Sequence, residues 1–285
     1  MSIADLRFLV VEDHEFQRKV LLRILAGLGA ANVSVAADGR EALEVVMAPD
    51  STVDIIISDL DMPGMDGAEF MRHLGEAHVP VAIILASALG GLLLASVEAT
   101  TRDYGVRILG VIEKPLTPAK LAALIDLHAP IQPAPPGAWS LVKSAPAVVV
   151  KGLAHGLRRQ LDQWSRIAQP AVCVDRSVLA AICDGNAAAE REILADFRRV
   201  NDADAAVFTL AVKQCDAGQV TSSSDRISGA SKSIGAFALS RATERVERAS
   251  AIGDWKVAQA RMGKFERELG RLNNYCEEAN CTSPA

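Results

Sequence analysis

The sequence predicts an α/β domain built on a doubly wound, five-stranded parallel sheet, followed by an all-α antiparallel helical bundle. Over the first 128 residues, five short apolar runs alternate with five amphipathic stretches. Such alternation is typical of a parallel sheet with helices on both faces. From about residue 174 onward there is no strand pattern, and the apolar residues follow helical spacing instead.

The expected strands are mostly continuous runs of Val, Ile and Leu, as in strands that are covered on both faces. They lie at 7–11, 33–36, 54–59, 81–87 and 107–112. The stretches between them predict helices at 15–28, 40–48, 67–76, 92–103 and 118–127. These elements assign residues 1–128 to the first domain.

A proline-rich segment separates the two expected domains. Residues 129–173 contain Pro130, Pro133, Pro135 and Pro136, which cannot continue a helix. This segment is expected to be a semi-rigid linker, with one further helix near 148–168.

The second domain is expected at residues 174–285, with helices near 175–183, 189–214, 220–237, 239–252 and 255–277. The last helix has the clearest pattern, and Gly253 and Asp254 before it indicate a helix stop followed by an N-cap. Its apolar residues recur every three or four positions and form one stripe: Trp255, Ala258, Met262, Phe265, Leu269, Leu272 and Tyr275. We expect these side chains in the core of a bundle.

Composition argues against several classes of protein. The net charge of −5 gives no attraction to nucleic acid or acidic lipid. The five cysteines include no CxxC pair, so neither a zinc site nor a disulfide framework is expected, and a reducing compartment fits better. Residues 79–97 carry no charge, but Pro80, Ser87 and Gly90 interrupt them, so a buried strand, a loop and a helix start explain them better than a membrane span.

Polar residues stand at the ends of four expected strands. Glu12 and Asp13 follow the first strand, Asp59 ends the third, Ser87 ends the fourth and Lys114 follows the fifth. Ligands of an open parallel sheet bind beyond the carboxyl ends of the strands. We therefore expect these five side chains to meet at one rim.

Three carboxylates at such a rim repel one another by about 4 kcal/mol per pair at a separation of ~4 Å. A divalent cation relieves this repulsion, and an oxygen-rich site with few protein ligands suits Mg²⁺. A cation beside Asp59 would polarise an incoming phosphoryl group, while Lys114 would neutralise another of its oxygens. A carboxylate can act as the nucleophile and form an acyl phosphate.

The motifs around these residues resemble those of receiver domains in bacterial two-component response regulators, which have a flavodoxin-like fold. The resemblance covers residues 6–127 and follows the order of the motifs. It is carried by Val10-Val11-Glu12-Asp13, by the loop Asp59-Leu60-Asp61-Met62-Pro63-Gly64-Met65-Asp66-Gly67, by Ala86-Ser87-Ala88 and by Glu113-Lys114-Pro115.

This resemblance implies that Asp59 is the phosphoacceptor and that Ser87 and Lys114 bind the phosphoryl group. It implies a Mg²⁺ site formed by Glu12, Asp13, Asp59 and the backbone carbonyl of Asp61. It also implies a sensor histidine kinase or a phosphotransfer protein as phosphodonor, and a bacterial cytoplasmic protein. From the net charge and the interrupted apolar stretch at 79–97, no nucleic-acid or membrane partner is expected.

Two features depart from the family. Receivers often carry an aromatic residue three positions before the lysine, but Val111 stands there, so coupling has to run through Ser87 and backbone shifts, or is weak. The expected helix 92–103 begins with three leucines, Leu92 to Leu94, and they cannot all face the sheet. We expect an interface there with the second domain or in a homodimer.

The segment 224–236 resembles the core motif of histidine phosphotransfer (HPt) domains, in which an exposed His is followed by Lys and Gly. The resemblance covers about residues 174–278. This chain keeps the glycines Gly229 and Gly235, but Asp225 stands at the histidine position and Ser228 at the lysine position, and no His occurs after His155. The degenerate surface expected from this motif comprises Asp225, Ser228, Gly229 and Lys232. The bundle is therefore expected to be an HPt-like domain that cannot form phosphohistidine, with Asp225 as an ordinary solvated residue as the alternative.

Three functions are consistent with these patterns. The first is a response regulator in which phosphorylation of Asp59 controls binding of the degenerate bundle to a kinase, a receiver or an output protein. The second is a phosphatase, in which Asp225 and Ser228 on an exposed helix position water against a partner's acyl phosphate. The third, a DNA-binding regulator, is disfavoured because the basic residues of the last two helices alternate with acidic ones. Apart from phosphotransfer at Asp59 and its hydrolysis, the first function is not enzymatic.

Overall fold

The structure is a computed structural model that describes residues 2–60, 62–87, 106–128 and 173–281. Residues 1–130 and 173–285 belong to one compact unit. The expected helices at 92–103 and 148–168 and the carbonyl of Asp61 lie outside the described residues, as does the interface expected at Leu92 to Leu94.

The five predicted strands are present and form one parallel sheet. They are β1 (Arg7–Val11), β2 (Asn32–Ala36), β3 (Ile55–Asp59), β4 (Ala82–Ser87) and β5 (Arg107–Glu113), in the order β2-β1-β3-β4-β5. A short 3-10 helix, η1 (Ile3–Asp5), precedes them. Strand β2 lies on one side of β1 and β3 on the other, and ligands of such sheets bind beyond the carboxyl ends of the strands at this point.

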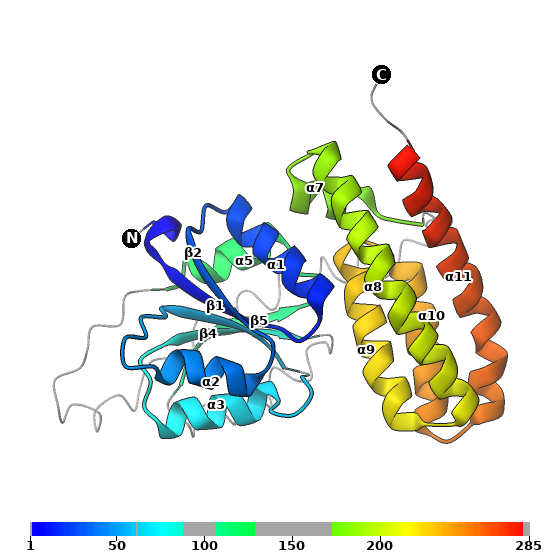
Figure 1. Ribbon diagram of the computed structural model, residues 1–285, viewed down its shortest axis with the longest axis horizontal. Helices are drawn as coiled ribbons and strands as arrows, with labels where there is room; N and C mark the ends of the chain where they lie inside the picture. The colour runs from blue at the N-terminus through cyan, green and yellow to red at the C-terminus, as the bar shows by residue number, and fades with distance from the viewer. Residues whose placement is uncertain (1, 61, 88–105, 129–172, 282–285) are drawn as a thin grey trace, which may run out of the picture. The chain divides into compact units, whose positions relative to one another are not determined.

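Helices cover both faces of this sheet (Figure 1). One face carries α1 (Glu15–Gly27) and α5 (Pro118–Ile125), and the other carries α2 (Gly39–Met47) and α3 (Gly67–Glu76). Because strand residues alternate between faces, Phe8 and Val10 belong to the first core while Leu9 and Val11 belong to the second. The predicted helices 15–28, 40–48, 67–76 and 118–127 agree with these four helices to within two residues at each end.

The edge strand β2 differs from the expectation of strands buried on both faces. Only Ala36 of its five residues is buried, and Val35 remains 44% exposed. The central strands β3 and β4 are buried throughout. An apolar run therefore identified the strand correctly but not its burial, because β2 has a neighbour on one side only.

The second half of the described chain is helical. A short helix, α7 (Arg176–Cys183), precedes α8 (Ala187–Gln214), α9 (Ala217–Ser233), α10 (Phe237–Ala251) and α11 (Trp255–Cys281). Turns of two or three residues join α8 to α9, α9 to α10 and α10 to α11, so consecutive helices run antiparallel (Figure 1). These four helices form the bundle. The predicted cap is confirmed: Asp254 accepts a hydrogen bond from the backbone N–H of Val257, and Gly253 has a φ of +77°.

The core of the bundle is continuous with one core of the α/β domain. Phe16 and Val20 of α1 belong to the same buried cluster as Leu179 of α7 and Phe197 of α8. The rings of Phe16 and Phe197 meet edge to face, with centroids 5.4 Å apart. Helix α1 therefore has two buried sides, one against the sheet and one against the bundle.

Gly67 at the start of α3 is expected to tolerate no side chain. A Cβ there would lie 2.7 Å from the carbonyl oxygen of Asp59 and 2.9 Å from Cα of Leu60, and neither backbone atom can move freely. Gly67→Ala should therefore destabilise the protein by about 1–3 kcal/mol in urea unfolding. Gly27→Ala serves as the control, because its Cβ would have no neighbour within 4 Å. An equal effect of the two substitutions would contradict the packing argument.

Candidate functional site

Three carboxylates meet at the carboxyl ends of β1 and β3, as the sequence predicts. Glu12 and Asp13 follow β1 directly, and Asp59 is the last residue of β3. One oxygen of each lies within 4.8 Å of one oxygen of each of the others. Glu12 and Asp59 are buried, with 3% and 6% exposure, whereas Asp13 is half-buried. The strand ends therefore concentrate negative charge in a pocket of low dielectric.

Lys114, which follows β5, lies inside this pocket. Its ammonium nitrogen donates hydrogen bonds to Asp59 Oδ2 at 2.6 Å, to Gln17 Oε1 at 2.6 Å and to Glu12 Oε2 at 3.2 Å. Its backbone N–H donates to the carbonyl of Ser87, the fully buried last residue of β4. The structure thus brings the five predicted side chains to one end of the sheet.

The protonation equilibria reflect this crowding. Burial raises the pKa of the Glu12 carboxyl to about 8, because the attraction of Lys114 only partly offsets burial and the repulsion of Asp59 and Asp13. Burial and the charge of Asp59 also raise the pKa of Asp13. Burial alone would lower the pKa of Lys114, but Glu12 and Asp59 outweigh it and raise that pKa. One buried cation therefore faces three acids.

This donor set fits a divalent cation. The three carboxylates supply hard oxygen ligands within reach of a single ion, and Lys114 is hydrogen-bonded to only two of them, Glu12 and Asp59. Glu12, Asp13 and Asp59 would hold Mg²⁺, which would supply further positive charge beside a phosphoryl group.

Gln17 belongs to the pocket although the sequence did not single it out. It lies in the first turn of α1, is 8% exposed and accepts the hydrogen bond from Lys114. Its backbone N–H donates to Nδ1 of His14, which caps the helix. A polar residue among the apolar positions of an amphipathic helix is the only sequence signal that would have indicated it.

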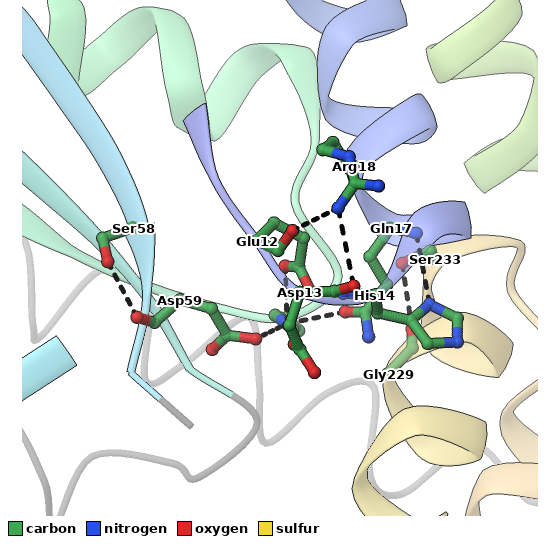
Figure 2. A network of polar contacts seen from close by, with 10 residues as sticks. Glu12, Asp13, His14, Gln17, Arg18, Ser58, Asp59, Gly229 and Ser233 are labelled. Carbon is green, nitrogen blue, oxygen red and sulfur yellow. Dashed lines mark hydrogen bonds and ion pairs between the residues drawn. The ribbon is translucent and has the colours of Figure 1, made fainter. Parts of the chain in front are cut away.

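The bundle reaches the pocket at Gln17. Figure 2 shows Gly229 of α9 near Gln17. A Cβ at Gly229 would lie 2.7 Å from both terminal atoms of the Gln17 amide. Only glycine permits this approach without movement of Gln17.

A buried polar contact also joins the start of α1 to the bundle, next to Gln17 and Gly229. His14 Nε2 lies 2.9 Å from Asp204 Oδ2 of α8, and Arg226 Nε of α9 lies 3.0 Å from Asp204 Oδ1. Because Nδ1 of His14 accepts from Gln17, Nε2 carries the proton and donates to Asp204. The sequence indicates only a solvated or structural role for His14. In the structure it is buried, and it joins α1 to the bundle.

The degenerate HPt positions are not exposed as the sequence implied. Ser228 is 3% exposed, and its hydroxyl contacts the Ser240 hydroxyl at 2.7 Å and Glu244 Oε1 at 3.0 Å. Lys232 Nζ lies 2.9 Å from Glu244 Oε1. Asp225 is half-buried and has an interaction partner. The expectation of an exposed acid and hydroxyl was wrong for Ser228, because this side of α9 packs against α10.

Glu244 is expected to make the bundle sensitive to acid. Burial alone would raise the pKa of Glu244, but Lys232, Ser228 and Ser240 outweigh it and lower that pKa below its ordinary value of 4.5. Its contribution to stability is therefore present above about pH 4.5 and is lost as the pH falls through the folded-state pKa. Glu244→Gln should cost about 1–2 kcal/mol at neutral pH and almost nothing in acid.

Glu247 provides the matched control in the same helix. Burial raises its pKa, although the Ser224 hydroxyl donates to it. Its ionisation is therefore unfavourable in the folded state, and Glu247→Gln should have the opposite pH dependence. Denaturant unfolding at several pH values measures both, and parallel profiles would contradict the assignment.

Comparison with known proteins identifies the first domain. Residues 8–126 match the family described as "Response regulator receiver domain", and this part of the chain is a receiver domain. The cyclic di-GMP phosphodiesterase RocR of Pseudomonas aeruginosa is 32% identical over 172 residues, or 60% of this chain, which spans only 42% of that protein. The chemotaxis protein CheY-3 of Vibrio cholerae is 29% identical over 126 residues, covering 43% of this chain and 90% of that protein.

A crystal structure of Vibrio cholerae CheY4 matches 43% of this chain and 97% of the CheY4 chain, with 27% identity and a TM-score of 0.37.

Within the described ranges, no helix combines the length and the apolar character that crossing a membrane requires. The receiver domain implies a phosphodonor such as a histidine kinase.

Proposed function

We propose that this chain is a response regulator in which phosphorylation of Asp59 controls the binding of an HPt-like bundle to a signalling partner. A sensor histidine kinase or a phosphotransfer protein would supply the phosphoryl group. The observation that carries the proposal is the position of Asp59: it shares a buried pocket with Lys114 and two further acids, next to the helix on which the bundle packs.

The chemistry of the pocket supports Asp59 as the acceptor. One of its oxygens would attack phosphorus, and the bond from phosphorus to the donor's leaving group would break, the leaving group keeping the electron pair. Lys114 would neutralise a phosphoryl oxygen, and the Ser87 hydroxyl would bind another. The three acids would bind Mg²⁺.

The bundle supports a binding role rather than a relay role. Its four antiparallel helices and the close approach allowed by Gly229 agree with an HPt-like domain. Position 225 carries Asp instead of His, so the bundle would bind without receiving a phosphoryl group at that position. The phosphatase alternative is not favoured, because the Ser228 hydroxyl that it requires is buried against Ser240 and Glu244.

Asp59→Ala is expected to abolish phosphorylation and regulation together. After incubation with acetyl phosphate and Mg²⁺, intact-mass spectrometry should show one added phosphoryl group in the wild type and none in the variant. Asp66→Ala is the control, because Asp66 only caps α3 by accepting from the N–H of Glu69. Phosphorylation of the Asp59→Ala chain would refute the assignment of the acceptor.

The partner is tested with the same proteins. The tagged full chain, with and without phosphorylation, is used to capture proteins from a lysate of the host. Partner capture that depends on acetyl phosphate in the wild type, and not in Asp59→Ala, supports the proposed control. Capture that is identical in the two chains contradicts it.

A further inference from the structure

We propose that Gln17 couples the bundle to the phosphoacceptor pocket: while the bundle is docked on α1, Gln17 is held on Lys114, and the receiver accepts a phosphoryl group slowly. This inference rests on the proposed role of Asp59 as acceptor. It assigns to the bundle a restraining contact with its own receiver, made through Gly229 and Gln17.

Every N–H group of the Lys114 ammonium already has a hydrogen-bond partner. A lysine ammonium has three N–H groups and no acceptor. In this structure all three have partners, namely Glu12, Gln17 and Asp59. None remains for a phosphoryl oxygen, so one of these contacts has to break before Lys114 can neutralise the group that is transferred.

Of these three contacts, the one with Gln17 restrains Lys114. Asp59 loses its negative oxygen when it becomes an acyl phosphate, and Glu12 is the most distant partner, at 3.2 Å. Gln17 is a neutral group at 2.6 Å and takes no part in the transfer. Its amide competes directly with a phosphoryl oxygen for one N–H of Lys114.

The bundle lies against Gln17 at Gly229 of α9. The space beside the Gln17 amide is filled by the backbone of α9 at Gly229, and Gln17 is almost completely buried. The contact between His14 and Asp204 and the packing of Phe16 on Phe197 hold α8 against the same turn of α1, and Arg226 of α9 is paired with Asp204. The docked bundle therefore favours the position of Gln17 in which its amide contacts Lys114.

The coupling works in both directions. If docking of the bundle disfavours the phosphorylated state, phosphorylation disfavours docking by the same factor. A phosphoryl group on Asp59 would draw Lys114 away from Gln17 and leave a buried amide without its donor, which weakens the docked arrangement. The surface of α8 and α9 that contacts α1 would then become available to the partner.

Two substitutions relieve the restraint by different means. Gln17→Ala removes the amide, and Gly229→Ala displaces it, because the new Cβ would lie 2.7 Å from its terminal atoms. Each should raise the initial rate of phosphorylation by acetyl phosphate about tenfold, the effect of one hydrogen bond to a charged group. The double variant should be no faster than Gln17→Ala alone, because both changes act on one contact.

Gly218→Ala is the matched control in the same helix. A Cβ there would meet only the Asp216 side chain, at 3.6 Å, so the rate should equal that of the wild type. Hydrogen exchange of α1 and α9 supplies a second readout, since phosphorylation should increase exchange in both helices in the wild type. Thermal unfolding establishes that every variant is folded.

The outcomes separate the two proposals. If no chain is phosphorylated on Asp59, the proposed function fails and the inference fails with it. If phosphorylation proceeds but Gln17→Ala and Gly229→Ala match Gly218→Ala, only the inference is overturned. Strictly additive effects of the two substitutions would also overturn it, because Gly229 would then act independently of Gln17.

Discussion

Replacing Phe197 by alanine is expected to lower the free energy of unfolding by about 3–5 kcal/mol. Phe197 has no exposed surface, and its ring packs on Phe16 of α1 across a core that also includes Leu179 of α7. Alanine would leave a cavity between α8 and α1. The cavity would stay open, because each of the two helices is also packed against the rest of its own domain. Urea unfolding followed by circular dichroism measures the loss.

The control is Phe208→Ala, a substitution inside the bundle. Phe208 is equally buried, but its ring packs on Phe265 of α11, at a centroid distance of 5.0 Å. Both variants should be destabilised, yet only Phe197→Ala should increase hydrogen exchange in α1. Equal protection of α1 in the two variants would contradict a core shared by receiver and bundle. A double-mutant cycle with Phe16→Ala should show a coupling of about 0.5–1.5 kcal/mol.

Much of the receiver fold could be predicted from the sequence because it rests on short-range patterns. Continuous apolar runs identified the strands, and polar residues directly after β1 and at the end of β3 placed Glu12, Asp13 and Asp59 in one pocket. The cap of α11 at Asp254 was predicted from an equally local pattern. These features depend only on the spacing of apolar residues along strands and helices and on the common direction of parallel strands.

The contacts of α1 could not be predicted in the same way. Its buried residues Phe16, Val20 and Ile24 recur every fourth position, and Leu21 and Leu25 form a second row. Together these rows have the usual width of an apolar stripe on a helix that packs against a sheet, so they do not indicate a second partner. Gln17 belongs to the site because Lys114, 97 residues further along the chain, donates a hydrogen bond to it, and its approach to Gly229 spans more than two hundred residues.

The second domain shows the limit of a motif. Gly229 was singled out by a resemblance to the HPt motif, and its neighbour in space is Gln17 of the same chain. Ser228 was placed on an exposed surface by its sequence position, although Ser240 and Glu244 bury it. Residue spacing fixes which positions share a helix face, and tertiary packing decides what covers that face.

Replacing Lys114 by methionine is expected to cost about 3–5 kcal/mol, the usual effect of removing one partner from a buried charge cluster. Methionine retains much of the length of the side chain but leaves Glu12, Asp13 and Asp59 with no cation from this position. Partial protonation of Glu12 limits the loss, because its pKa already lies at about 8 in the wild type. Urea unfolding at constant pH gives the difference directly, and Lys213→Met, at an exposed position of α8, should change stability by less than about 0.5 kcal/mol.

A second substitution separates charge repulsion from lost packing. Asp59→Asn in the Lys114→Met background removes one of the repelling carboxylates, so it should recover part of the lost stability, whereas a packing defect would remain. Added Mg²⁺ should stabilise Lys114→Met more than the wild type, because the ion would bind three acids that no lysine neutralises. If neither the Asp59→Asn substitution nor Mg²⁺ restores stability, the acids are not the source of the loss. Recovery by both would mean that Lys114 and a bound cation share one task, which is to keep three carboxylates together at the position where a phosphoryl group is to be received.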